Sequence, residues 1–501
     1  MGLAILRSRA QAGVDAPAVT VEVFLSGGLP KFNIVGLAET AVRESKDRVF
    51  GAIKSSQFDF PQQRITANLG PADMKKTGGR FDLPIAVGIL VASRQVPQTA
   101  IDEYEFFGEL AMSGELRPVA GILPAAIKAS RAGRPIIVPV DNAAEAALAG
   151  GDVFTARNLL EVTGQLRGGV VTDPVRRRSS PEVARIDADM RDVRGQASAR
   201  RALEIAAAGG HNILLCGPPG TGKSMLARRL PCLLPAMTHE EAMEAAAVRS
   251  ILGVPLDVER LRARPFRSPH HTATAPALVG GGSEPTPGEI SRAHNGVLFL
   301  DELPEFGRHV LEVLREPMET GRIAIARAGG HAEFPAKFQL VAAMNPCPCG
   351  YLGDADGACH CSADAVRRYR ARLSGPLLDR IDIKVDVARP PPAALRPDAP
   401  PGEPTAPIAK RIAAARRRQL ERAGKVNARL RPAELADAFN AGPGVFDLLE
   451  QVASKLVLSA RAYQRVQRVA RTIADLAGED ETTTMHIGEA VSFWQPDRRS
   501  D

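Results

Sequence analysis

Residues 217–224 carry the clearest chemical motif of the 501-residue sequence. They match the pattern G-x-x-x-x-G-K-[ST] at every fixed position and lie between an apolar stretch and a helical one. Backbone N–H groups of such a loop surround phosphate oxygens, and the following helix adds the positive end of its dipole. We expect Lys223 to reach the β- and γ-phosphates of a nucleotide and the Ser224 hydroxyl to hold Mg²⁺. The predicted nucleotide-binding residues are Gly217, Pro218, Pro219, Gly220, Thr221, Gly222, Lys223 and Ser224.

Two adjacent carboxylates, Asp301 and Glu302, follow a second apolar stretch. At the tip of a buried strand, Asp301 could bind Mg²⁺ through water, and Glu302 could polarise the water that attacks a γ-phosphate. The alternative is that these acids cap a helix. Their place downstream of the phosphate loop, within the same α/β region, favours the catalytic interpretation.

Two further side chains could complete such a site. Asn345 ends a third apolar stretch, at the edge where ligands of parallel sheets bind, and its amide could hold the attacking water. A turn-forming Asn before Pro is the alternative. Arg380 follows an apolar turn, where most arginines form surface ion pairs, so its type and position alone do not assign it a catalytic role.

A group of four thiols lies within fifteen residues, at Cys347, Cys349, Cys359 and Cys361. In a reducing compartment such clustering predicts a tetrahedral zinc site. The C-x-C spacing is less common than C-x-x-C, so free thiols stay open as the alternative. Cys216 and Cys232 flank the phosphate loop and are predicted to be core residues. The histidines His270, His271 and His294 have no acidic or cysteine partner at ligand spacing, which favours loop or polar-network roles.

The elements that must position these side chains are short apolar strands separated by helical patterns. Continuous apolar strands of this kind indicate a parallel sheet that is covered on both faces. We place this second α/β region at residues 191–389, after a first α/β region at 1–172 and a basic linker at 173–190. A Pro-rich linker at 390–407 precedes a helical region at 408–501.

The composition is that of a globular protein, with 45% hydrophobic and 24% charged residues. Aromatic residues make up only 4%, which argues against a stacking platform for single-stranded bases. We find no apolar stretch long enough to span a bilayer and no signal peptide. Six cysteines are too few for a secreted disulfide scaffold, so we expect a cytoplasmic protein.

Positive charge is concentrated in residues 410–431, which hold nine Lys/Arg and one acid, Glu421. One interpretation is a solvated helix face. The other is a surface that contacts a phosphate backbone.

Five stretches together closely resemble the ComM/YifB family of bacterial AAA+ ATPases, which are described as magnesium-chelatase-like. They read RGQASARRALEIAAAGGHNILLCGPPGTGKS, FRSPHHTATAPALVGGG, PGEISRAHNGVLFLDELPEF, AAMNPCPCGYLGD and RLSGPLLDRIDI. The resemblance implies an α/β protein with an N-terminal Lon-protease-like α/β domain, a P-loop AAA+ parallel-sheet core and a C-terminal helical lid.

The resemblance also implies a role for each matching residue. Residues 217–224 correspond to Walker A, and Asp301 with Glu302 to Walker B. Asn345 corresponds to sensor 1, and Arg380 to an arginine finger that acts on a neighbouring subunit. Arg461 resembles the sensor 2 arginine of the helical lid.

Members of this branch carry an extra β-hairpin before sensor 1 and an insert in helix 2. Residues 322–338 have two β-like arms around Ala-Gly-Gly and fit the hairpin, with Arg327 near its tip as a candidate phosphate contact. Residues 266–282 fit the helix 2 insert less clearly.

The N-terminal region resembles the Lon protease domain in FFGELAMSGELRPVAGILPAAIKA but departs from it at the catalytic positions. The nucleophilic Ser should lie near residues 78–84, which contain no Ser, and the Lys partner should fall near Leu123. Because acylation by a Ser–Lys dyad needs both members, we predict an inactive module that serves assembly or substrate contact.

The function implied by the resemblance is a hexameric ring that hydrolyses ATP with Mg²⁺ and translocates on single-stranded or branched DNA. It would promote branch migration in recombination of incoming DNA during natural transformation. A magnesium-chelatase-like ATPase that remodels a protein without DNA is the alternative. A Lon-like peptidase is a further one, against which the missing dyad counts.

Overall fold

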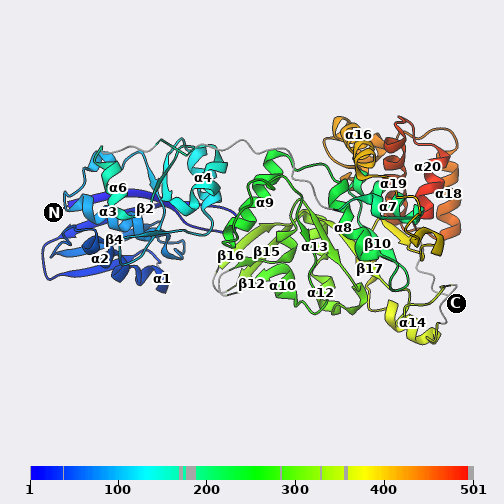
Figure 1. Ribbon diagram of the computed structural model, residues 1–501, viewed down its shortest axis with the longest axis horizontal. Helices are drawn as coiled ribbons and strands as arrows, with labels where there is room; N and C mark the ends of the chain where they lie inside the picture. The colour runs from blue at the N-terminus through cyan, green and yellow to red at the C-terminus, as the bar shows by residue number, and fades with distance from the viewer. Residues whose placement is uncertain are drawn as a thin grey trace.

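The computed structural model describes residues 2–37, 39–168, 173–175, 188–282, 285–327, 330–354 and 359–494. An N-terminal α/β domain lies at one end of an elongated molecule, a second α/β domain lies in the middle, and a group of helices lies at the other end (Figure 1). Most of the basic linker predicted at 173–190 and the side chain of Arg327 lie outside the described part. None of the described helices combines the length and apolar character needed to cross a membrane.

The N-terminal domain is built on a seven-stranded mixed sheet with the order β3-β4-β2-β1-β5-β8-β9. Its long strands alternate as the sequence predicts, so that Val19, Val21 and Val23 of β2 are buried while Thr20 and Phe24 are exposed. The strands are β1 (Gly2–Arg9), β2 (Ala18–Ser26), β3 (Lys31–Val35), β4 (Arg64–Gly70), β5 (Glu105–Phe106), β8 (Ile136–Pro139) and β9 (Val153–Ala156), with a small hairpin β6 (Glu109–Leu110) and β7 (Leu116–Arg117). The helices are α1 (Thr40–Arg43), α2 (Ser45–Ser55), α3 (Asp82–Ala92), α4 (Ile122–Arg131), α5 (Ala143–Ala146) and α6 (Leu159–Leu166).

The central domain contains the predicted parallel sheet, with the strand order β11-β14-β17-β10-β18. Apolar side chains of alternate residues pack into two separate clusters, one on each face, which is why these strands are continuously apolar. The strands are β10 (Ile213–Cys216), β11 (Phe266–Arg267), β14 (Val297–Leu300), β17 (Gln339–Met344) and β18 (Ile383–Asp386). The helices around them are α7 (Ala197–Gly209), α8 (Lys223–Leu233), α9 (His239–Ile251), α12 (Arg308–Glu312), α13 (Arg315–Thr320), α14 (Ala363–Arg370) and α15 (Gly375–Leu378).

Two β-hairpins of this domain lie beside each other (Figure 1), and the apolar face of one of them, that of β15 and β16, is buried in the core. The hairpin of β15 (Arg322–Arg327) and β16 (Gly330–Pro335) comes directly before β17, as predicted. The second hairpin, β12 (Gly280–Gly281) and β13 (Thr286–Pro287), interrupts the helical segment of α10 (Ala275–Val279) and α11 (Glu289–Arg292). The insert expected at 266–282 is therefore longer than predicted, because β12 pairs with β13 beyond it.

The C-terminal region is helical, as the sequence predicts, and two of its helices pack on α7 of the central domain. These helices are α16 (Thr405–Ala423), α17 (Pro432–Phe439), α18 (Val445–Leu456), α19 (Ala460–Ala477) and α20 (Thr484–Ser492). The Pro-rich segment before α16 connects the two regions, and none of its described residues at 390–404 is buried. It contains a 3₁₀ turn at Pro392–Leu395, and the Gly402 N–H donates to the Arg191 carbonyl at 2.8 Å.

The N-terminal domain docks on the central domain through α4 and α9. Helix α9 begins with a capping box between Thr238 and Glu241, and the Leu123 side chain is completely buried against its apolar face. The shared apolar cluster contains Leu123, Leu148, Met237, Ala242, Ala245, Ala246 and Leu261. The Leu123 N–H donates to the Ser250 hydroxyl at 3.2 Å, so the interface is also fixed by hydrogen bonding.

Candidate active site

The phosphate loop connects β10 to α8 at the carboxyl edge of the parallel sheet. Gly217 lies directly against the neighbouring strand end, because a Cβ there would lie 2.2 Å from the Val387 carbonyl oxygen. Gly222, with a φ of 84°, provides the left-handed turn from which α8 begins at Lys223. The glycines of the motif are therefore required by backbone geometry as well as by phosphate access.

The Lys223 ammonium is buried among neutral oxygens. It donates to the carbonyls of Gly217 at 2.6 Å and Pro218 at 2.8 Å, and to the amide oxygen of Asn345 at 3.1 Å. Among the described residues no carboxylate forms an ion pair with it, and burial lowers the pKa of Lys223. A phosphate would supply the negative charge that this cation lacks.

Ser224 and Asp301 bring two oxygen ligands together. The Ser224 hydroxyl donates to Asp301 Oδ2 at 2.6 Å, while Asp301 Oδ1 accepts the backbone N–H of Glu302 at 3.0 Å. A hydroxyl and a carboxylate oxygen are ligands that Mg²⁺ prefers, so this donor set fits the ion expected with a nucleotide.

Glu302 stands at the end of the buried strand β14 in a left-handed backbone conformation, with φ 52° and ψ 47°. Its carboxylate contacts the imidazole of His271, with Oε2 and Nδ1 3.1 Å apart. The sequence indicated only a loop or network role for His271, and this partner was missed. Because β11 pairs with β14, the loop after β11 lies at the same sheet edge, so the strand order would have revealed the contact.

The structure brings together five of the predicted site residues: Lys223, Ser224, Asp301, Glu302 and Asn345. Each follows a strand of the sheet or begins the helix after one, and Asn345 reaches Lys223 from the end of β17. One edge of the sheet thus carries the Lys223 cation, the candidate metal ligands, the candidate base and the Asn345 amide. Phosphoryl transfer to water requires this arrangement.

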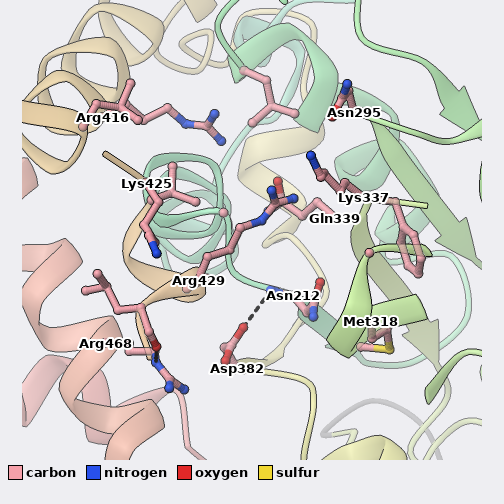
Figure 2. A pocket seen from close by; sticks show the side chains of 18 of the residues that line it. Asn212, Asn295, Met318, Lys337, Gln339, Asp382, Arg416, Lys425, Arg429 and Arg468 are labelled. Carbon is pink, nitrogen blue, oxygen red and sulfur yellow. Dashed lines mark hydrogen bonds between the residues drawn. The ribbon is translucent and has the colours of Figure 1, made fainter. Parts of the chain in front are cut away.

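Arg380 and Arg461 lie elsewhere, in the lining of a cavity of about 1200 Å³ between the central domain and the C-terminal helices. Figure 2 shows other residues of this lining, among them Asp382 and Arg468. The Arg380 guanidinium pairs with Glu319 of α13 and donates to the Pro376 carbonyl at 2.5 Å. No residue of the phosphate loop is among the described residues that line this cavity. The two arginines therefore share a site with each other and not with Lys223 of the same chain.

The basic segment 410–431 is divided between paired and unpaired cations. Five of its side chains form ion pairs within the described structure, namely Arg411, Arg418, Arg422, Lys425 and Arg431. Arg416 and Arg429 instead point into the cavity and have no described carboxylate partner (Figure 2). Burial lowers the pKa of both, that of Arg416 to about 9. The segment is thus neither a uniformly solvated face nor one continuous contact surface.

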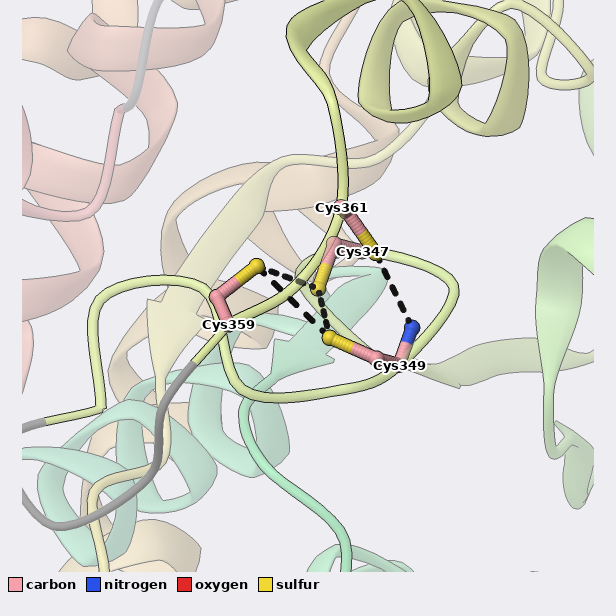
Figure 3. A group of neighbouring side chains, drawn as sticks. All are labelled: Cys347, Cys349, Cys359 and Cys361. Atoms are coloured by element: carbon pink, nitrogen blue, oxygen red, sulfur yellow. Dashed lines mark hydrogen bonds between the residues drawn. The ribbon is translucent and has the colours of Figure 1, made fainter.

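The four clustered cysteines converge after β17, as predicted (Figure 3). Their sulfurs all lie within 4.8 Å of one another, and all four are free thiols. This geometry fits a metal ion. Cys216 and Cys232 are half-buried and outside the cluster, and burial raises the pKa of both, that of Cys216 to about 11.

The other two histidines have the polar partners that the sequence predicted in general terms. His270 Nδ1 lies 2.9 Å from the Thr272 hydroxyl, and the buried His294 contacts Glu244 at 3.0 Å. The His294 imidazole holds the pKa of Glu244 well below its usual range, at about 2. Both histidines are parts of local networks.

Three family models match the chain, and together they cover most of it. Residues 189–395 match the model described as magnesium chelatase, subunit ChlI, and residues 402–494 match that of its C-terminal region. Residues 21–142 match the model described as subunit ChlI of Mg-chelatase.

Relatives of similar length share about half of the residues. The chain is 48% identical to the uncharacterized protein YifB of Salmonella typhimurium over 501 residues, which is 99% of this chain and 98% of the relative. It is 48% identical to the competence protein ComM of Haemophilus influenzae, over 98% of this chain and 97% of the relative. A shorter match, 29% identical over 172 residues, covers 30% of this chain and 48% of the magnesium-chelatase 38 kDa subunit of Rhodobacter capsulatus. The chain therefore belongs to the magnesium-chelatase-like AAA+ ATPase family that includes the ComM and YifB proteins.

Proposed function

We propose that this protein is a hexameric, ring-forming ATPase of the cytoplasm that translocates on single-stranded or branched DNA. Its task would be to drive branch migration when incoming DNA is recombined. The observation that carries the proposal is the 48% identity, along nearly the whole chain, to a relative named for competence. The hairpin of β15 and β16 supports it, because it belongs to the same domain as the phosphate loop and leaves one face exposed to a partner such as DNA.

In the proposed reaction, Glu302 polarises the attacking water and the Asn345 amide orients it in line with the γ-phosphate. Lys223 moves from its carbonyl partners to the phosphates, where it neutralises developing charge. Mg²⁺, when bound by Ser224 and Asp301, supplies further neutralisation of the phosphate oxygens. Each role uses a side chain at the carboxyl edge of the sheet.

Arg380 and Arg461 would act on the nucleotide of a neighbouring subunit. Both line a cavity whose described lining includes no phosphate-loop residue, which supports a role toward a neighbouring nucleotide rather than that of the same chain. In a ring, each subunit would present its two arginines to the phosphate loop of the next subunit, which brings them to a γ-phosphate.

The DNA contact would come from the hairpin of β15 and β16, with Arg327 as the candidate for a backbone phosphate. Of the basic segment 410–431, Arg416 and Arg429 are the candidates for a further anion contact, because the ion-paired members already have partners. Binding through phosphates would tolerate many sequences and weaken steeply with salt.

Two further assignments belong to the proposal. Zinc would be the metal at the four-cysteine cluster. The N-terminal domain would be a Lon-like module without peptidase activity, since residues 78–84 contain no Ser and Leu123 stands near the expected Lys position.

The test is ATP hydrolysis and branch migration, measured with and without a branched DNA substrate. We expect DNA to stimulate hydrolysis and ATP to drive migration, and Lys223→Ala to stop migration while most DNA binding remains. Hydrolysis that is indifferent to DNA, with no migration at any salt concentration in protein shown to form rings, would refute the DNA-motor proposal. That outcome would favour a chelatase-like remodeller of a protein partner.

A further inference from the structure

The four-cysteine cluster has the dimensions of a metal–thiolate centre. The sulfur of Cys347 lies 3.4 Å from that of Cys349 and 3.7 Å from that of Cys359, and the sulfurs of Cys349 and Cys359 are 3.6 Å apart (Figure 3). In a tetrahedral centre with Zn–S bonds of about 2.3 Å, neighbouring sulfurs lie about 3.8 Å apart. The Cys349 N–H also donates to the Cys361 sulfur at 3.4 Å, the kind of supporting hydrogen bond that metal ligands receive.

The loop that carries the first two cysteines touches the nucleotide site directly. Only Pro346 separates Cys347 from Asn345, whose amide oxygen accepts a hydrogen bond from Lys223. Gly350, whose N–H donates to the Cys347 carbonyl at 3.0 Å, packs against the phosphate loop. A Cβ on Gly350 would lie 2.7 Å from Pro219 Cδ and 3.7 Å from Asn345 Cγ, so no larger residue fits between the loops.

We propose that one zinc ion, bound by the four thiolates, fixes this loop against the phosphate loop and thereby positions the Asn345 amide. The positioning role rests on the proposed ATPase mechanism, whereas the metal site rests on the sulfur geometry alone. Residues 345–354 form no helix or strand, so few regular hydrogen bonds hold them, and a metal cross-link supplies the missing restraint. A displacement of about 1 Å at a group that orients a reactant can lower a rate on the order of 10²-fold.

The metal is tested first, on protein purified without chelator. We expect about one zinc ion per chain by metal analysis, with four sulfur neighbours at about 2.3 Å in X-ray absorption at the zinc edge. Cys361→Ser should remove most of the zinc, and Cys232→Ser, at a half-buried thiol on α8 outside the cluster, should leave it in place. Less than about a tenth of an equivalent of zinc in the unaltered protein would overturn the proposal.

The positioning role is tested by separating turnover from binding. We expect Cys361→Ser to lower kcat at least about tenfold while KM for ATP changes less than about twofold, because Lys223 and the phosphate loop still bind nucleotide. Asn345→Ala should lower kcat similarly, and the double variant should be no slower than Asn345→Ala, since both changes remove one interaction. A Cys361→His variant that regains zinc should regain kcat in proportion, which separates loss of the metal from simple unfolding.

Two results would overturn the positioning role: losses of kcat that add fully in the double variant, or a loss of ATP affinity as large as the loss of kcat. Zinc at one equivalent in a protein without any ATPase activity would instead refute the proposed function, and the positioning role with it, while leaving the metal site intact.

Discussion

Glu302 holds an exposed carboxylate on a backbone conformation that costs a non-glycine residue about 1–2 kcal/mol. Two contacts maintain it: its N–H donates to Asp301 Oδ1, and its carbonyl accepts the Glu305 N–H at 2.8 Å. Strain of this kind concentrates at functional sites, where the surrounding structure determines the geometry. Here it accompanies the contact between the Glu302 carboxylate and the His271 imidazole.

Replacing Glu302 with Gln should preserve ATP binding and lower hydrolysis by about 10²- to 10⁴-fold, because the amide cannot polarise water. Binding of a fluorescent ATP analogue and release of phosphate would measure the two effects separately. Glu305→Gln is the matched control. Glu305 lies three residues after the candidate base and pairs with Arg372. Hydrolysis by Glu302→Gln at the unaltered rate would show that another group is the base.

The His271 imidazole contacts the Glu302 carboxylate, which in the proposed mechanism must polarise the attacking water. Removing this imidazole should therefore increase ATP hydrolysis in the absence of DNA. We expect His271→Ala to raise the basal rate about two- to fivefold, which corresponds to losing an exposed polar contact worth up to about 1 kcal/mol. His309→Ala, at an exposed histidine of α12, is the control, because no contact in the described structure joins it to Glu302. A basal rate that falls in His271→Ala would instead make His271 a positive contributor to the reaction.

The elements differ in how far their sequences reveal them. Strands β10, β14 and β17 could be predicted because their continuous apolar residues fill both faces of a parallel sheet. The hairpin β12–β13 could not, since its arms are Gly280–Gly281 and Thr286–Pro287, which have no β-type alternation. This hairpin depends on its contact with the neighbouring hairpin. A Cβ on Gly280 would lie 2.9 Å from the Ile325 side chain of β15.

The hairpin of β15 and β16 should transmit movement to DNA in the proposed mechanism. Arg327→Ala should leave ATP hydrolysis largely intact and reduce branch migration severalfold, because the element loses its phosphate contact near the tip. Arg322→Ala, at the base of the same hairpin, is the control, since Arg322 already pairs with Glu333. Parallel assays of hydrolysis and migration would decide, and an unaffected migration rate would exclude this contact.

At the scale of the whole molecule, the residues expected at one ATPase site occupy two separate places. The phosphate loop, the carboxylates and Asn345 lie at the sheet edge, whereas Arg380 and Arg461 line the cavity beside the C-terminal helices. For Arg380 the family resemblance already implied a site on a neighbouring subunit, whereas the place of Arg461 depends on how α16 and α19 pack on α7, which the sequence does not reveal. Type and spacing identified the residues at the sheet edge, the family resemblance added Arg380 and Arg461, and tertiary packing shows which of them meet.

A shared site predicts complementation between different variants. Arg380→Ala subunits and Lys223→Ala subunits should each be inactive alone, because one lacks the finger and the other lacks the phosphate cation. Mixed rings should regain part of the activity, since some interfaces combine an intact phosphate loop with an intact arginine. ATP hydrolysis across a series of mixing ratios would measure this, and no recovery in rings shown to be mixed would argue that Arg380 does not act in trans.

The contact between α4 and α9 limits the directions in which this chain can still evolve. Leu123 is completely buried between the two domains, and its N–H donates to the Ser250 hydroxyl. It lies near the position where a Lon-like dyad would need a lysine. A lysine there would bury an ammonium in an apolar cluster at a cost of several kcal/mol, which would weaken the contact between the two domains. The interface thus couples changes in the two domains: a substitution on α4 is tolerated only with a matching one on α9, so the two surfaces can change only together.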